Sequence, residues 1–196
     1  AERHWRQAAD NVAISDLGDP LVEAVPNFSE GRDPVVIEAL AASLDGRGAR
    51  VLHVDANADA NRTVVTLAGP LTAVTEALYR GVGEAVSRID MRQQEGEHIR
   101  VGAADVVPLV LLEPGEQARR ACLAGVDSLA SRLAQDFGLP IFLYEASAKR
   151  EPFRSLPRCR RGGFLFGCPR RRLRRRRPQR HRLGRQGPRP RCLLRP

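Results

Sequence analysis

The composition of the chain changes abruptly near residue 151, and this boundary decides which part of it can fold. All 23 acidic residues and 15 of the 32 basic residues lie in residues 1–151, which carry a net charge of −8. Residues 152–196 contain 17 arginines and no acidic residue, which gives a net charge of +17. Their one apolar cluster, residues 164–166, buries too little surface to offset the entropy lost on ordering the segment. We therefore expect the folded part to end near residue 150.

We expect residues 151–196 to be a disordered Arg-rich tail, for which two explanations stay open. In the first, the tail comes from a shifted reading frame, because out-of-frame translation of GC-rich DNA yields Arg, Pro, Gly and Cys without Lys or acids. In the second, it is a nucleic-acid-binding arm on a non-catalytic α/β scaffold, with residues 170–177 contacting phosphates. Residues 1–20 are polar and aperiodic, and we expect them to form a flexible N-terminal extension.

Residues 21–150 have the length of one ordinary domain and show alternating strand and helix patterns. Asp33-Pro34, for example, combines a capping side chain with proline at the first helical position. The expected strands are residues 21–25, 51–54, 63–67, 106–112 and 140–144, and the expected helices are residues 34–44, 71–89 and 114–137. This order predicts an α/β (α+β) plait, in which a ferredoxin-like β-α-β-β-α-β sheet gains an additional helix and strand.

Location and metal binding can also be assessed from the sequence. Four cysteines are too few for a disulfide framework, and no apolar run is long enough for a membrane span or a secretory signal. We therefore expect a soluble, cytoplasmic protein. Residues 55–59 begin like a calcium loop, but Ala60 replaces the glycine and Thr66 replaces the final glutamate of such loops. No metal site is predicted.

The residues best suited to chemistry lie in the polar loop 95–105. This loop holds His98, three acids and Arg100, directly before an expected buried strand. The ordinary pKa of histidine lies near neutrality, which suits proton transfer in a cell. Taken alone, His98 is either a catalytic base or an ordinary polar loop residue. His53 lies within an expected strand, where packing is the simpler interpretation, and residues 55–62 form a second loop with acids, amides and an arginine.

Three blocks of sequence resemble the glutamate formiminotransferase family, in order and with compatible spacing over about residues 21–165. They are residues 22–32 (VEAVPNFSEGR), residues 54–70 with Val-Asp-Ala, Asn-Arg-Thr-Val and Gly-Pro, and residues 89–105 with Ile-Asp-Met and Gly-Glu-His. The resemblance implies transfer of the formimino group from N-formimino-L-glutamate to the co-substrate tetrahydrofolate, in histidine degradation. It also implies a tendency to form homodimers. Such a transferase has two α/β subdomains, of which this chain would carry the first, so we expect a truncated and impaired enzyme.

The resemblance also suggests roles for individual residues. His98 matches the catalytic histidine of the family, and Asp55 lies in the Val-Asp-Ala block, where it would orient the histidine or the folate. The residues expected to bind substrate or folate are Asn27, Asn61, Arg62 and Arg100. Each of these four can alternatively serve a turn or a strand end. The chain departs from the family at Ile99, where proline is usual, and after Phe164, where a glycine-rich folate-binding segment and the second subdomain are expected.

Overall fold

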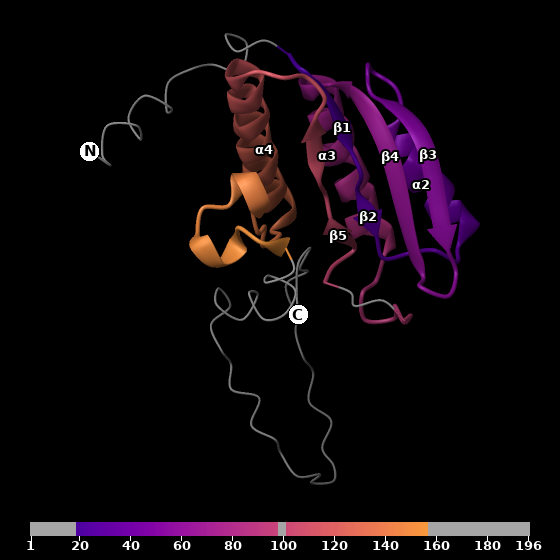
Figure 1. Cartoon of the computed structure of the whole chain (residues 1–196). Helices are drawn as coiled ribbons and strands as arrows, with labels where there is room; N and C mark the ends of the chain where they lie inside the picture. The colour runs from indigo at the N-terminus through magenta and orange to yellow at the C-terminus, as the bar shows by residue number, and fades with distance from the viewer. Residues whose placement is uncertain (1–18, 98–100, 157–196) are drawn as a thin grey trace, which may run out of the picture.

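The computed structural model describes residues 19–97 and 101–156, and Figure 1 shows how their elements are arranged. The strands are β1 (Leu21–Ala24), β2 (Asn27–Phe28), β3 (Arg50–Asn57), β4 (Arg62–Pro70), β5 (Ala104–Val106) and β6 (Leu109–Leu111). The helices are α2 (Pro34–Leu44), α3 (Leu71–Arg88) and α4 (Glu116–Phe137), followed by the 3-10 turns η2 (Glu145–Ser147) and η3 (Glu151–Phe153). Of the expected N-terminal extension 1–20 and Arg-rich tail 151–196, residues 1–18 and 157–196 lie outside the described residues. The described ends correct the two boundaries, because Pro20 accepts the N–H of Leu71 and Phe153 is buried in a small cluster with Phe142.

The described strands form a curled antiparallel sheet with β4 in its interior. β3 pairs with one side of β4, and β1 and β2 pair with the other. β6 and β5 pair in turn with β1 and β2. β1 and β2 form one line that is interrupted at Pro26, and β5 and β6 form another that is interrupted at Pro108. The two interruptions lie side by side, because the Val25 N–H donates to the Pro108 carbonyl at 3.1 Å.

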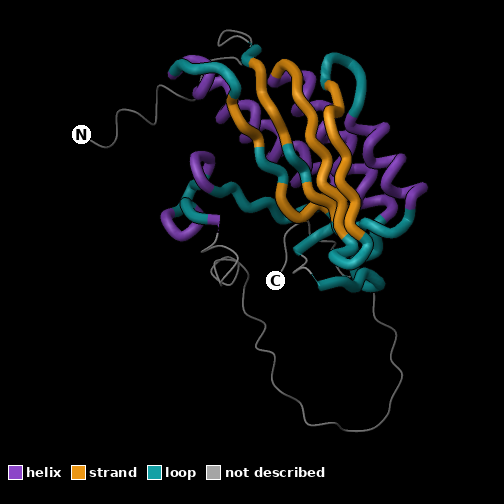
Figure 2. Tube along the Cα trace, turned by 45° about the vertical axis from the view of Figure 1, so that its right-hand side comes forward, coloured by secondary structure: helices purple, strands orange, loops and turns teal. Residues whose placement is uncertain are grey.

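The two faces of this sheet have different surroundings. α2 and α3 lie on one face, and α4 packs against α3 and β6, as Figure 2 shows from a second side. Along β4, the odd-numbered side chains point toward the helices and are buried, whereas residues 62, 64, 66 and 68 point the other way and are half-buried. We call this second face, on which no described α-helix packs, the open face. The largest fully buried apolar side chains are Val22, Phe28, Leu40, Leu44, Val65, Leu67, Leu71, Val74, Leu78 and Val82.

The ends of the helices follow from local chemistry, as the sequence predicts. The Asp33 carboxylate accepts the N–H groups of Val35 at 2.9 Å and Val36 at 3.4 Å, so it caps α2. Gly138 ends α4 in the left-handed conformation, with φ of 64°, which glycine adopts without a steric penalty. Within the described part of the chain, no helix combines the length and the apolar character that crossing a membrane requires.

Two expectations about strands are corrected by the structure. Residues 140–144 are not a strand and have no ladder partner among the described residues. Instead, Phe142 and Tyr144 pack against Val101 and Phe153, and the ring centroids of Phe142 and Phe153 are 5.8 Å apart. The expected loop 55–62 is also shorter, because β3 and β4 extend into it and Asp55 lies within a strand.

The strand expected over the apolar run 106–112 is not continuous: β5 ends at Val106, and β6 covers Leu109–Leu111. Pro108 has no N–H and stands between them, so it cannot continue the ladder.

Candidate functional site

Three polar side chains meet where β2, β4 and β5 lie next to one another. The guanidinium of Arg62 places Nη1 2.8 Å from Oδ2 of Asp105. Its Nε and Nη2 donate to Oδ1 of Asn27 at 3.0 and 2.7 Å. The side chains of Arg62 and Asp105 are only 13% and 2% exposed, so the ion pair is shielded from water. A shielded and hydrogen-bonded pair of this kind has a defined orientation, which a surface ion pair lacks.

The register of the sheet explains why these residues meet. Asn27 lies opposite Val64 of β4 and opposite Val106 of β5, so β2 brings its side chain between the other two strands. The sequence predicts Asn27 and Arg62 as contacts to substrate or folate, and the structure brings them together. It also shows that Nε, Nη1 and Nη2 of Arg62 are already donating within the protein.

Asn61 joins three segments of the chain at the same end of the sheet. It is 3% exposed and has a positive φ of 46° at the turn between β3 and β4. Its Oδ1 accepts the Gly31 N–H at 2.8 Å, and its Nδ2 donates to Oε1 of Gln94 at 2.6 Å and to the Glu95 carbonyl at 3.0 Å. The side chain expected to contact substrate therefore binds protein groups on two sides.

Glu30 lies beside Asn61 and is nearly buried, with 7% of its surface exposed. Its Oε1 accepts the N–H groups of Gly31, Arg32 and Asp33 at 2.8–3.0 Å, and its Oε2 accepts Nε2 of Gln94 at 2.9 Å. Burial acts to raise the pKa of Glu30, but these hydrogen bonds to the carboxylate outweigh it and hold the pKa below its usual value. Glu30 is therefore an ionised anchor for the loop after β2.

His98 and Arg100, the catalytic and binding residues expected in the loop 95–105, lie outside the described residues. The described chain on both sides is fastened to the same end of the sheet. On one side, Glu97 donates its N–H to the Asp59 carbonyl at 3.5 Å. On the other side, Ser29 donates its N–H to the Ala103 carbonyl at 2.9 Å and its hydroxyl to the Gly102 carbonyl at 2.8 Å.

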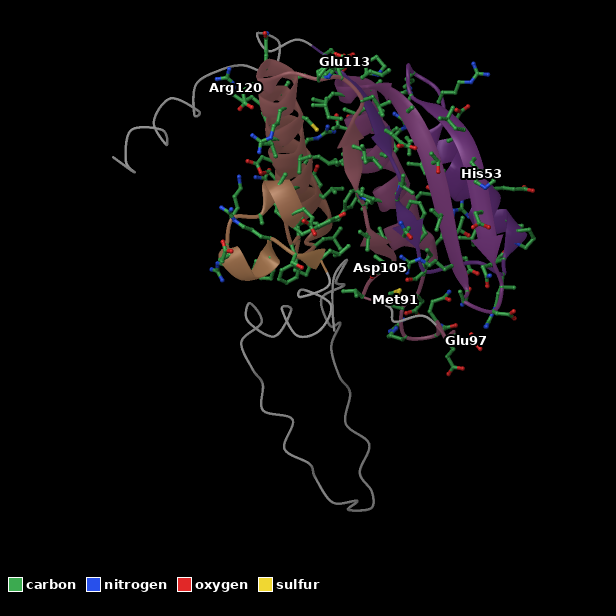
Figure 3. All side chains as sticks on the ribbon, in the orientation of Figure 1. His53, Met91, Glu97, Asp105, Glu113 and Arg120 are labelled. Atoms are coloured by element: carbon green, nitrogen blue, oxygen red, sulfur yellow. The ribbon has the colours of Figure 1, made fainter. Side chains whose placement is uncertain are left out.

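Asp55 and His53 lie on the outermost strand, β3, and both are exposed. They lie opposite Val64 and Thr66 of β4, so they share the open face with Arg62. Figure 3 shows His53 on this outer strand, apart from Asp105, Met91 and Glu97 at the lower end of the molecule. Asp55 shares a face with the Arg62 cluster but has no hydrogen bond to it among those that the structure shows.

Three residues of this site were not singled out from the sequence. Asp105 is one of the three acids of the loop 95–105 and Glu30 lies in the first family block, but neither was given a role of its own, and Gln94 carries no local motif. Glu30 accepts hydrogen bonds from backbone N–H groups, and Gln94 binds side chains that are distant in the sequence. Their roles are therefore visible only in the contacts of the folded chain. Among the described residues, no group of three or more His, Cys, Asp and Glu side chains is placed to hold a metal ion.

A cavity of about 470 Å³ lies between α4, the β5–β6 edge and residues 141–147, and Asp105 of the polar cluster is among the residues that line it. Its walls are mostly aliphatic, and they include Val107, Leu109, Val126 and Leu129. Cys122 lines the cavity too, and burial raises the pKa of its thiol, as in a cysteine that packs in an apolar environment. The chemistry of this cavity differs from that of the polar cluster on the open face.

The comparisons with known proteins agree on one family. The family described as the formiminotransferase domain, N-terminal subdomain, matches residues 21–183. The glutamate formimidoyltransferase of Streptococcus pyogenes serotype M1 is 38% identical over 145 residues, which is 74% of this chain and 48% of that protein. The formimidoyltransferase-cyclodeaminase of Gallus gallus is 40% identical over 145 residues, 74% of this chain and 26% of that protein. The chain thus spans about half the length of the first relative and about a quarter of the second.

Proposed function

The chain belongs to the formiminotransferase family as its N-terminal subdomain, and from this premise we propose that it forms one half of a glutamate formimidoyltransferase. In the complete enzyme, the formimino group would pass from N-formimino-L-glutamate to tetrahydrofolate, as a cytoplasmic step of histidine degradation. The observation that carries the proposal is the family match across the whole loop 95–105, together with the polar cluster on the open face. The described ends of that loop are held next to this cluster.

We propose that His98 is the general base and acid of the transfer. The N5 nitrogen of tetrahydrofolate attacks the formimino carbon and forms the new C–N bond, while His98 accepts the N5 proton. The bond from that carbon to the glutamate nitrogen then breaks, and the protonated His98 returns a proton to the departing amine. General acid–base assistance of this kind contributes about 10²–10⁴-fold in rate.

The polar residues of the open face have supporting roles in this proposal. Asn27, Arg62 and Arg100 would bind the substrate carboxylates or the pterin, and Asp55 would orient the histidine or the folate from β3. Because Arg62 already holds Asp105 and Asn27, we propose that it contributes an oriented positive potential rather than a free guanidinium fork. Asn61 is proposed to bind indirectly, through the residues 94–95 that it fixes.

Loss of a histidine side chain gives a direct test of this function. In a hybrid where residues 19–156 replace the matching part of the Streptococcus pyogenes relative, His98→Ala should lower the rate of glutamate release at least about tenfold. His53→Ala is the matched control, because His53 is an exposed histidine on the open face with no role in the proposed transfer. Near-normal turnover of the His98 variant would remove this residue from the mechanism.

The isolated chain tests a second part of the proposal. With the remainder of the folate cleft missing, tetrahydrofolate should bind far more weakly to this chain than to the complete relative. Calorimetric titration of both proteins measures the difference. Equal affinities would place the whole folate site within this chain and overturn the two-half arrangement.

We also propose that residues 21–150 are the subdomain and that its sheet is the ferredoxin-like plait expected from the sequence. The strand order β3, β4, β1–β2, β6–β5 supports this assignment, as do α2 and α3 on one face.

A second candidate function rests on the 17 arginines of residues 152–196. Under this alternative the tail binds nucleic acid, and removal of residues 166–196 should abolish binding to nonspecific RNA in a salt-dependent assay. Unchanged RNA binding by the shortened chain would exclude it.

A further inference from the structure

The cavity beside α4 is larger and more apolar than the spaces that usually remain inside a folded domain. It has a volume of about 470 Å³, whereas protein interiors contain few voids larger than a water molecule. Its walls are mostly aliphatic, so water finds few hydrogen-bond partners there. Its volume lies in the range of pockets that bind apolar groups. The cavity is therefore suited to an apolar occupant.

The walls of the cavity show how much surface an occupant would bury. Leu123 and Val126 of α4 line one wall, Leu109 of β6 lines another, and Ile141 lines a third. All four residues are only half-buried, although residues of this type are usually buried in a core. An apolar group in the cavity would remove this surface from water, which is favourable. It would also join the helix, the sheet edge and the segment after α4 through one set of contacts.

The described chain ends at the rim of this cavity. Leu156, the last described residue, donates its N–H to Oε1 of Glu145 at 2.8 Å, and Glu145 lines the cavity. Phe153 packs against Phe142, another lining residue, so the chain is already fixed before this point. Figure 1 shows these last described residues, in orange, folded back beside the lower end of α4. The residues that follow therefore start next to the cavity.

The sequence directly after this point contains a matching apolar cluster. Residues 164–166 are Phe-Leu-Phe and follow two glycines, which allow the chain to turn. The stretch from Leu156 to residue 164 spans at most about 29 Å when extended, because each residue adds at most about 3.6 Å. So short a connection keeps the cluster near the cavity at a high effective concentration. Leu193 and Leu194, the next adjacent leucines, lie much farther along the chain.

The described chain begins at the other end of the molecule. Asp19 accepts the Thr72 N–H at 2.9 Å, at the start of α3, and neither residue lines the cavity. Figure 1 shows these first described residues at the top, away from the last described residues at the lower end of α4. The segment that follows Leu156 is therefore better placed to enter the cavity than residues 1–18.

We propose that residues 164–166 dock in this cavity and complete the core between α4, the β5–β6 edge and residues 141–147. The two phenylalanine rings and the leucine cover the half-buried aliphatic side chains of the walls. Three residues bury too little surface to order the whole Arg-rich tail, but docking has to fix only these three. The family match extends to residue 183, so the cluster lies within the matched part of the chain.

Docking would also support the polar cluster of the candidate site. All three residues of β5, Ala104–Val106, line the cavity, and β5 pairs with β2. Asp105, at the centre of this strand, holds Arg62 through the shielded ion pair. An occupant packed against β5 would oppose movement of this strand away from β2. The docked residues 164–166 would therefore help to hold Asp105 in place.

Removal of the two rings tests whether the cluster docks. In urea denaturation of the 196-residue chain, Phe164→Ser/Phe166→Ser should lower the equilibrium constant for folding at least about tenfold, because two apolar side chains lose their burial. The matched control is Leu193→Ser/Leu194→Ser, which removes two apolar side chains from the same tail and should leave the constant within about twofold. Trp5→Ser tests the N-terminal segment as occupant and should also leave it within about twofold.

A bulky side chain in the cavity tests where the cluster docks. Ala130 is half-buried on α4 and lines the cavity. In the original chain, Ala130→Phe competes with the docked cluster and should lower the equilibrium constant for folding. In the Phe164→Ser/Phe166→Ser chain it fills the cavity and should raise the constant, so the two effects should differ by about tenfold.

Three results would overturn the proposal. The first is a Phe164→Ser/Phe166→Ser chain that folds with an unchanged equilibrium constant, which would mean that the cluster does not dock. The second is an equal effect of Ala130→Phe in both chains, which would place the cluster outside the cavity. The third is a tenfold loss in the Trp5→Ser variant, which would make the N-terminal segment the occupant.

Discussion

The two faces of β4 belong to one strand, yet different interactions stabilise them. On the helix side, Val65 and Leu67 are completely buried, and apolar contact from α2 and α3 surrounds them. On the open face, Val64 and Thr66 are only half-buried, and order comes from the directed contacts of Arg62. Apolar contact tolerates small shifts, whereas a hydrogen bond fixes atoms in position. One face thus supplies stability, and the other supplies placed polar groups.

The largest effect is expected from the helix side. Phe28→Ala removes a completely buried ring and should lower the free energy of unfolding by about 4 kcal/mol. Urea denaturation of both proteins measures this loss. If the variant loses less than about 1 kcal/mol, the helix-covered face is not the main source of stability.

The shielded ion pair on the open face should also contribute to the free energy of unfolding. Arg62→Gln leaves the Asp105 carboxylate, which is only 2% exposed, without its cation and should cost about 3 kcal/mol. The control replaces both partners, as Arg62→Met/Asp105→Leu, and should recover most of that loss in the same denaturation assay. Equal losses in the single and double variants would mean that the charges themselves contribute little.

Glu30 should contribute less to the free energy of unfolding, and its contribution should depend on pH. Because its pKa is lower in the folded chain than in the unfolded chain, its carboxylate stabilises the fold above the unfolded-state pKa of about 4.3. That contribution is lost as the pH falls through the lower, folded-state pKa. Glu30→Gln should therefore cost about 1 kcal/mol at pH 7 and flatten the loss of stability below pH 4.3. Parallel pH profiles for both proteins would contradict this role.

The smallest effect should come from an open-face position outside the polar cluster. Thr66→Ala removes a half-buried side chain opposite His53 and should change the free energy of unfolding by less than about 0.5 kcal/mol. It is the counterpart of the Phe28 variant on the other side of the sheet. A loss of several kcal/mol would show that the open face is covered by packing after all.

The sequence predicted those parts of the fold that depend on local chemistry. The cap at Asp33, the stop at Gly138 and the three helices all follow from short-range patterns. The full length of β3 and β4 was not predicted, because the polar side chains that these strands carry are also typical of a loop. The prediction of a strand at 140–144 was wrong. An apolar run with aromatic side chains can be buried in a sheet or in a small side-chain cluster, and this one packs into a cluster with Phe153.

The candidate site was predictable only in part. Asn27 and Arg62 were named from family blocks, but their shared contact with Asp105 joins residues 43 positions apart. Pairing at that distance in the chain depends on strand register, which no local motif encodes. Glu30 escaped notice because its partners are backbone N–H groups, which every residue except proline has.

The adjacent interruptions at Pro26 and Pro108 divide the sheet along a crease. Beyond it, β2 has two residues and β5 has three, and only β3 and β4 run unbroken from one side to the other. Asn27 and Asp105 of the polar cluster stand on these two short strands, whereas Arg62 stands on β4. The contacts of Arg62 therefore tie the two short strands to the unbroken part of the sheet. On the opposite face, Phe28 anchors β2 in the helix-covered core, so the site end of the sheet is held from both sides.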